Sequence, residues 1–411
     1  MLLAAMCLPP TAFAEDASPP GADIGSVRAW LLDHNPELRA LQAEAEAAEA
    51  RVQPAGALPD PMFGLRLEGI DADRPNLLPG NVGMTQYSVR QAIPLWGKRD
   101  LARDIASQEA IALHEERSAT VLERLAETEQ AYVRYWHADA SLQVVDRLID
   151  LIHSIEAVAR ERYALGLAPQ QDAIRAQVAG TRLRAERIER AAVRDESAAQ
   201  LNTGMGRPVD AALTAPISEP AIDLPVDARE RGLTAIRGQS HPMLRAQTAM
   251  ANAADDAFDL QKRRRLPDLN VGVGLMQQGN RLESYELMFE VEIPFQRRAL
   301  HEREREASLR RDAAQARVEH ALSLLEARFG EAWARWVSAR DRQRLYRDTL
   351  LPQTEANFAS ALASYRVGDV DFATLLESLE AWQGADLSRL DARRDELQGA
   401  AELRALIGST P

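Results

Sequence analysis

The sequence predicts a mainly α-helical protein with a small β part, built from two copies of one unit of helix, β-hairpin, long helix and helix. Three observations support this fold class. Strong helix formers such as Ala, Leu, Glu and Arg dominate the composition. Four short segments alternate apolar and polar residues, and several motifs recur in the same order in both halves. With only 22 Gly and 21 Pro in 411 residues, we expect long uninterrupted elements.

Motifs shared by the two halves predict a tandem duplication. The recurring motifs keep one order and nearly one spacing: Asn35-Pro36 and His241-Pro242, Leu58-Pro59-Asp60 and Leu266-Pro267-Asp268, Ile93-Pro94 and Ile293-Pro294, Trp136 and Trp336, and Tyr163-Ala164-Leu165-Gly166 and Tyr365-Arg366-Val367-Gly368. We therefore expect a first repeat at 15–207, a Pro-rich linker at 208–230 and a second repeat at 231–411. Each repeat opens with a helix, about 36–53 and 242–264, that has proline at its first position.

The N-terminal segment 1–14 has the pattern of a signal peptide. A short apolar stretch is followed by Pro9 and Pro10, and then by the small-residue cleavage signal Ala12-Phe13-Ala14. The mature chain would then begin at Glu15. Cys7, the only cysteine, would be discarded and not acylated, and a single cysteine cannot form a disulfide framework. Beyond this segment no run of about 18 apolar residues predicts a membrane-spanning helix.

Four segments have the period of two that is typical of β-strands with unlike faces, at 62–68, 85–93, 269–275 and 285–293. Transmembrane β-barrels have this pattern. The alternative is a pair of soluble hairpins on a helical core, because soluble antiparallel sheets alternate in the same way. Both repeats carry the hairpin in the same place, which favours the barrel. Four strands cannot close a barrel around a channel, so several chains would have to share one.

Two stretches predict helices too long for a globular domain. Residues 97–165 contain no proline, and 296–367 contain only Pro352. A helix of this length would extend ~100 Å at 1.5 Å per residue. A three-four spacing of apolar residues predicts a coiled-coil seam at Leu322, Leu325, Phe329, Ala332, Trp336 and Ala339. The same seam in the first half is Leu122, Leu125, Glu129, Tyr132, Trp136 and Asp139, where the two acids interrupt it. The helical hairpins would span 97–205 and 297–408.

The composition argues against an enzyme and against a nucleic-acid partner. The net charge is -13, with 62 acidic and 49 basic residues, which disfavours a polyanion. The seven histidines are scattered, without the spacing of a zinc site, and the sequence has no P-loop and no nucleophile-elbow motif. We therefore predict no catalytic residue, no cofactor and no metal site.

The chain resembles the TolC-like outer-membrane efflux factors over almost the whole expected mature sequence. The duplicated plan carries this resemblance. The segments Gln91-Ala92-Ile93-Pro94-Leu95-Trp96-Gly97-Lys98-Arg99 and Leu58-Pro59-Asp60-Pro61-Met62 look most like the heavy-metal branch related to CzcC and CusC. The resemblance implies a homotrimer in the Gram-negative outer membrane. Its twelve-stranded β-barrel, four strands from each chain, would continue into a periplasmic α-helical barrel.

The resemblance also implies partners and site residues. The partners would be a periplasmic adaptor, an inner-membrane pump of the RND type and outer-membrane lipid. The adaptor-facing entrance would include Gly166, Leu167, Asp172, Gly368, Asp369 and Glu377. Of two acidic positions usual in TolC, one is retained as Glu377 and the other is Thr374. The alternative for these acids is ordinary solvated helix surface.

Two further groups of residues are expected to matter for conduction. Glu286, Glu290 and Glu292, if they face inward, would make the barrel lumen favour cations. Pro94 and Pro294 would mark the switch from strand to helix, because proline removes a ladder donor. The predicted function is passive export, most simply of heavy-metal cations. Multidrug export, type I protein secretion and a periplasmic coiled-coil scaffold or adaptor are the alternatives.

Overall fold

The computed structural model describes residues 19–70, 73, 75–225 and 227–408, so the signal-peptide prediction for 1–14 lies outside the described residues. The chain divides into two compact units, and both repeats contribute to each. The first unit combines the chain up to Glu37 with Val121–Leu233 and the chain from Ala327 onward. The second unit combines Leu38–Thr120 with Thr234–Glu326. The long helices of both repeats therefore contribute one end to each unit.

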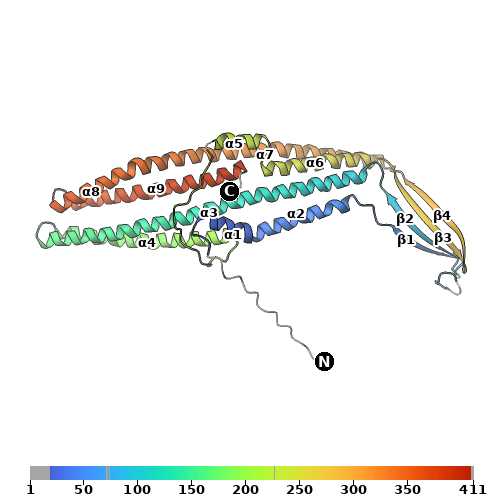
Figure 1. The fold of residues 1–411 in the computed structure, drawn as a ribbon, viewed down its shortest axis with the longest axis horizontal. Helices are drawn as coiled ribbons and strands as arrows, with labels where there is room; N and C mark the ends of the chain where they lie inside the picture. Colours follow the sequence, from blue (N-terminus) through green and yellow to red (C-terminus); the bar gives the residue numbers. More distant parts are fainter. Residues whose placement is uncertain (1–18, 71–72, 74, 226, 409–411) are drawn as a thin grey trace, which may run out of the picture. The chain divides into compact units, whose positions relative to one another are not determined.

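Helices make up most of both repeats (Figure 1). The first repeat has α1 (Ile24–His34), α2 (Pro36–Ala55), α3 (Lys98–Ala164) and α4 (Gln170–Gly204). The second has α5 (Ala228–Arg237), α6 (Pro242–Arg263), α7 (Arg297–Leu345), the π-helical turn η1 (Tyr346–Leu350), α8 (Leu351–Val367) and α9 (Phe372–Ile407). None of the described helices has an apolar stretch long enough to cross a membrane.

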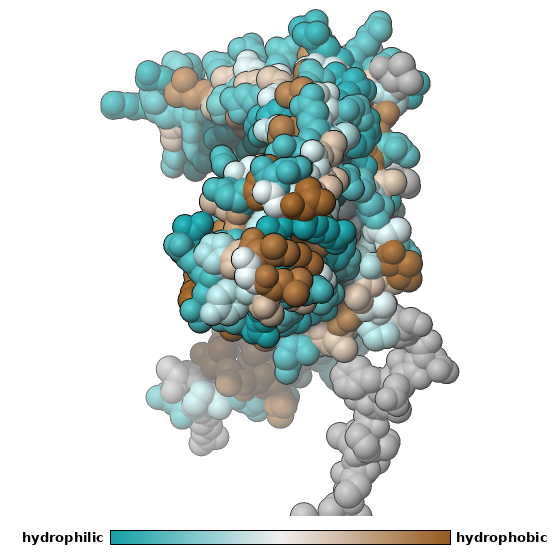
Figure 2. Space-filling view, turned by 90° about the vertical axis from the view of Figure 1, so that its left-hand side faces the viewer, coloured by the Kyte–Doolittle hydropathy of each residue, from teal (hydrophilic) through white to brown (hydrophobic). Residues whose placement is uncertain are grey.

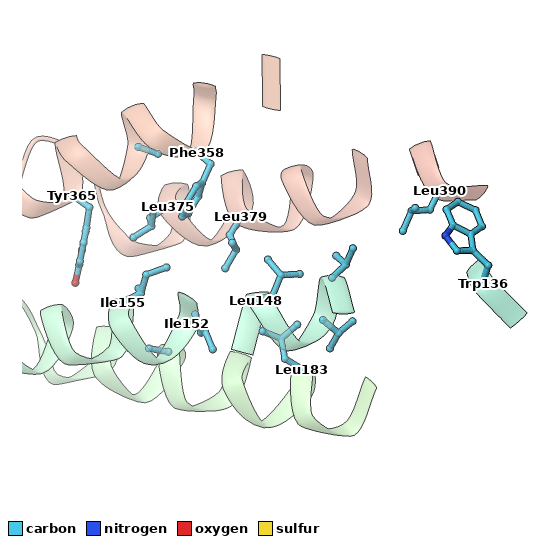
Figure 3. Packing of buried hydrophobic residues seen from close by; sticks show 14 of the residues in the cluster. Trp136, Leu148, Ile152, Ile155, Leu183, Phe358, Tyr365, Leu375, Leu379 and Leu390 are labelled. Atoms are coloured by element: carbon cyan, nitrogen blue, oxygen red, sulfur yellow. The ribbon is translucent and has the colours of Figure 1, made fainter. Parts of the chain in front are cut away.

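The first unit is held together by apolar side chains between two helical hairpins, α3 with α4 and α8 with α9. Figure 3 shows these side chains pointing toward one another from both hairpins. Val145, Ile152 and Leu375 are almost completely buried. At about 25 cal/mol per Å² of apolar surface, burial of this extended layer is the main force that aligns the hairpins.

The first repeat's long helix is continuous, whereas the second repeat's helix contains a π turn. Pro352 has no backbone N–H, so the carbonyl of Asp348 lacks its usual helical donor. The N–H of Leu351 instead bonds to the carbonyl of Tyr346, five residues earlier, which adds one residue to the turn. The hydroxyl of Thr354 donates to the carbonyls of Leu350 and Leu351, at 3.0 Å each. The expectation of one uninterrupted helix is therefore wrong at this turn.

The second unit contains a four-stranded antiparallel sheet in the order β1-β2-β3-β4. Its strands are β1 (Met62–Glu68), β2 (Met84–Ile93), β3 (Asp268–Gln278) and β4 (Arg281–Glu292). The strands β3 and β4 extend toward their shared turn beyond the expected ranges, because Gly279, in the left-handed region at φ +58°, allows a tight hairpin turn. The outer strands β1 and β4 have no strand partner on their free edges within the described residues.

Two short helices were not expected from the sequence. The helix α1 begins after Asp23, whose side chain accepts a hydrogen bond from the N–H of Ser26 at 2.8 Å. This capping contact satisfies one of the free donors at the helix start. The helix α5 begins at Ala228, inside the expected linker at 208–230. Each repeat therefore has an additional short helix before the helix that starts at Pro36 or Pro242.

Candidate functional site

The ends of the two helical hairpins have the same backbone geometry. Gly166, after α3, has φ +68°, and Gly368, after α8, has φ +95°. At the first end the N–H of Leu167 donates a hydrogen bond to the carbonyl of Arg162 at 2.8 Å. At the second end the N–H of Asp369 donates to the carbonyl of Ser364 at 2.9 Å. These are Schellman motifs, in which a left-handed glycine lets the last carbonyls of a helix find donors.

A polar network joins the two hairpins just behind these turns. The phenol of Tyr365, on α8, donates a hydrogen bond to the carboxylate of Asp172, on α4, at 3.2 Å. The guanidinium of Arg162, on α3, lies over the Tyr365 ring at 4.9 Å from its centroid. The same guanidinium donates to the backbone carbonyls of Tyr365 and Leu167. Three of the four helices of this bundle are therefore tied together by side chains.

Tyr365 and Asp172 are both buried, with 2% and 8% of their surfaces exposed. Burial raises the pKa of the Tyr365 phenol to about 12, and the neighbouring charge of Asp172 adds to the effect. The phenol is therefore neutral and able to donate at any physiological pH. Asp172 is not solvated helix surface, which removes that alternative for this position.

The remaining residues predicted at this end lie on its surface. Leu167, Asp369 and Glu377 are exposed, as is Thr374, whose N–H is capped by the side chain of Asp371 at 2.8 Å. Figure 2 views this end of the hairpins and shows apolar side chains gathered within a mostly hydrophilic surface. Exposed apolar residues of the two turns are Leu165, Leu167 and Val367.

Sequence reasoning did not find the roles of Tyr365 and Arg162. Tyr365 stands in a motif that the first repeat matches at Tyr163, yet the Tyr163 side chain is 47% exposed. The signal that could have indicated these roles was Asp172, a carboxylate in the first turn of α4. It is followed by Ala173 and Ala176, which are buried with it. A carboxylate beside a packed seam requires a donor from a neighbouring helix.

The second candidate site is the sheet, whose two faces differ in polarity. One face is mostly apolar and exposed: Tyr285, Leu287 and Phe289 of β4 are 80%, 72% and 69% exposed. The register continues this face across the sheet in rows such as Phe63, Val89, Val273 and Leu287. A sheet in a water-soluble protein buries such a face. Here the exposed apolar face is continuous over all four strands.

The opposite face carries the polar residues of the same strands. Glu286, Glu290 and Glu292 lie on it together, with Glu68 of β1 and the cations Arg66 and Arg90. The carboxylate of Glu286 accepts a hydrogen bond from the side chain of Gln86 at 2.5 Å. Carboxylates outnumber guanidiniums on this face, so its electrostatic potential is negative.

The strand-to-helix switch is built around a buried lysine. Pro94 lies between β2 and α3, and Pro294 lies in the same place between β4 and α7. After Pro94 the ammonium of Lys98 reaches back to both carboxylate oxygens of Asp268, at 2.9 Å each, and to the carbonyl of Leu266 at 2.8 Å. The N–H of Leu95 bonds to the Asp268 carboxylate as well, at 3.0 Å. Lys98 therefore fastens the start of α3 to the start of β3.

Solved structures with this arrangement are known. The chain has a TM-score of 0.79 to the structure of CusC, at 15% identity over 94% of this chain and 92% of that one. It has a TM-score of 0.78 to a membrane protein from Pseudomonas aeruginosa, at 20% identity over 95% and 91%. The outer membrane protein VceC from Vibrio cholerae gives 0.77, at 17% identity over 94% and 96%. At these identities the likeness concerns the fold.

The sequence itself defines the family. The profile of the outer membrane efflux protein family matches residues 29–207 and 238–409, which is most of both repeats. The chain therefore belongs to the outer membrane efflux protein family, whose members are efflux channels of the outer membrane. A comparison with curated protein sequences found no match.

Proposed function

We propose that this chain is the outer-membrane duct of a tripartite efflux system and conducts solutes passively out of the periplasm. The observation that carries the proposal is the sheet with an exposed apolar face and a polar opposite face. In a barrel of several copies, the apolar face would meet lipid and the polar face would line the lumen. A homotrimer of twelve strands, continued by a periplasmic helical barrel, is the assembly that the family resemblance implies.

The hairpin ends would form the periplasmic entrance and the adaptor contact. Leu165, Leu167 and Val367 expose apolar surface on these turns, which a protein partner could cover. Just behind them, Tyr365 and Asp172 would hold the hairpins of one chain together in the resting state. The adaptor would couple this end to an inner-membrane pump, proposed to be of the RND type, which supplies the energy.

The proposed cargo is a cation, with heavy-metal ions as the first candidates. Glu286, Glu290 and Glu292 lie on the face that would line the lumen, and such a face concentrates cations. The three structural likenesses described above differ by only 0.02 in TM-score, so they do not distinguish substrates. The heavy-metal assignment therefore depends on these carboxylates and on the motif resemblance at 91–99.

Conductance in planar bilayers tests the proposal. The purified protein should form pores whose reversal potential in a salt gradient indicates cation preference. Replacing Glu286, Glu290 and Glu292 together by Gln should reduce that preference without abolishing the pores, because the carboxylates act on ions and not on the fold. As a matched control, Glu302→Gln changes an acid of α7 outside the sheet and should leave selectivity unchanged. Anion-selective pores would contradict the cation assignment.

The alternatives are separated by simple observations. Multidrug export and type I secretion use the same kind of duct, so the genes beside this one, encoding a metal pump, a drug pump or an ABC exporter, would decide among them. A periplasmic scaffold or adaptor would fractionate with soluble periplasmic proteins. Recovery of the chain as a monomer that is soluble without detergent would contradict the duct proposal.

A further inference from the structure

The Lys98–Asp268 contact lies at the junction of the two repeats within one chain. Asp268 follows the Leu266-Pro267 motif at the start of β3, and Lys98 stands four residues after Pro94. The duplication places an equivalent residue at each position of this pair. Asp60 follows Leu58-Pro59 just before β1, and Arg298 stands four residues after Pro294. The second pair thus has the same charges and the same positions relative to the repeated motifs.

The second pair is not made within the chain. Asp60 and Arg298 are both exposed, and within the described residues neither side chain has an ion-pair or hydrogen-bond partner. Asp60 lies just before β1, and Arg298 lies in the first turn of α7, which follows β4; β1 and β4 are the outer strands of the sheet (Figure 1). The strands β2 and β3 bring Lys98 and Asp268 together by pairing antiparallel. Only a second copy of the chain, adding its β1 to this β4, would bring Arg298 and Asp60 together in the same way.

This inference rests on the duct proposed above. We propose that neighbouring copies join by pairing β4 of one copy with β1 of the next, in the same register as β2 and β3 within one chain. An ion pair between Arg298 of one copy and Asp60 of the next would hold this register. Transfer of the β2–β3 register through the repeat sets Val291 opposite Phe63 and Phe289 opposite Leu65. These are four of the exposed apolar side chains of the sheet. A slip by one residue would set apolar side chains against polar ones, so polarity and charge select one register.

One further contact of the internal junction has a counterpart at the proposed one. The indole N–H of Trp96 donates to the carbonyl of Pro267 at 2.7 Å, and the residue equivalent to Trp96 is Gln296, whose amide can donate to Pro59 of the next copy. On the polar face the same register sets Met288 opposite Arg66, between Glu286 and Glu290. Arg66 would then neutralise part of that carboxylate row at the seam.

Oxidative cross-linking of the full chain in membranes tests the register. In a Cys7→Ser background, Phe63→Cys combined with Val291→Cys should give covalent oligomers, which a reductant should convert back to monomers. Two control pairs represent slips by two residues: Phe63→Cys with Phe289→Cys, and Phe63→Cys with Ile293→Cys. Each should give little covalent oligomer. The equivalent internal pair, Gln91→Cys with Val271→Cys, are direct partners in β2 and β3 and should link without a gain in mass.

Charge exchange tests the ion pair. Asp60→Arg and Arg298→Asp should each reduce the fraction of chain that runs as a trimer on unheated gels, and the double variant should restore it. Oligomers linked only by a control pair, or a double variant no better than either single one, would overturn this inference and leave the duct proposal intact. A monomer in membranes would overturn both.

Discussion

Tyr365 donates its phenolic proton to the buried carboxylate of Asp172, across the space between two hairpins that lie in different repeats. Tyr365→Phe removes the donor and leaves the carboxylate buried without it, which should lower the free energy of unfolding by about 1–3 kcal/mol. If the pair holds the entrance closed, conductance per pore should rise as well. Tyr163→Phe, at the exposed counterpart, should change neither the thermal midpoint nor the conductance.

The same tyrosine gives a pH prediction. Its pKa is raised to about 12 in the folded chain, against 10 for the unfolded one. Between these values the unfolded chain loses its proton first, so the folded state loses stability as pH rises from 10 to 12 and keeps the full contribution below 10. Thermal midpoints measured across this range should fall less steeply in Tyr365→Phe than in the parent. Equal slopes would show that the phenol is not buried in solution.

Glu129 forms a buried ion cluster on α3. Its carboxylate, with none of its surface exposed, accepts hydrogen bonds from Arg28 of α1 and Arg404 of α9. Glu129→Gln removes the buried negative charge that faces the part-buried guanidiniums of Arg28 and Arg404, which should cost about 3–5 kcal/mol. Glu127→Gln removes an exposed partner of Arg124 and should cost at most about 1 kcal/mol. Chemical denaturation of both variants checks the difference; similar losses would argue against the burial of Glu129.

The two hairpin glycines differ in their surroundings. An alanine at Gly166 would meet no atom within 4 Å, so Gly166→Ala should cost only the backbone strain of a left-handed residue, about 1 kcal/mol. At Gly368 the new methyl would lie 3.1 Å from the Arg162 guanidinium, which packs over Tyr365. Gly368→Ala should therefore be the more destabilising of the two in thermal unfolding, and the reverse order would show that Arg162 does not occupy this place.

Neighbouring residues of β4 separate the two faces of the sheet. Phe289→Lys puts a charge on the apolar face and should block membrane insertion, at a cost of about 2–4 kcal/mol near the middle of a bilayer. Glu290→Lys alters the polar face and should permit insertion while weakening cation preference. Membrane fractionation followed by bilayer recording checks both. Normal insertion of Phe289→Lys would mean that this face does not meet lipid.

Local pattern predicted much of the fold, because strand alternation and repeat spacing are local properties. The alternation of Phe289 with Glu290 was enough to predict that the two side chains lie on opposite faces. Contacts between repeats were not predictable in this way. Tyr163 and Tyr365 stand in similar motifs, and only the packing of α8 against α4 makes one buried and leaves the other exposed. Glu129 looked like an interruption of the seam, because its partners Arg28 and Arg404 lie far away in the sequence.

The extra residue in the turn before Pro352 sets the direction of Tyr365. Upstream, Phe329, Ala332 and Ala339 lie on the buried side of the helix, and downstream Phe358, Ala361 and Tyr365 do. A helix without the insertion would advance each downstream side chain by about 100°, since one turn takes 3.6 residues. Tyr365 would then point away from Asp172. A proline thirteen positions away in the chain thus determines whether the two hairpins can be joined at all.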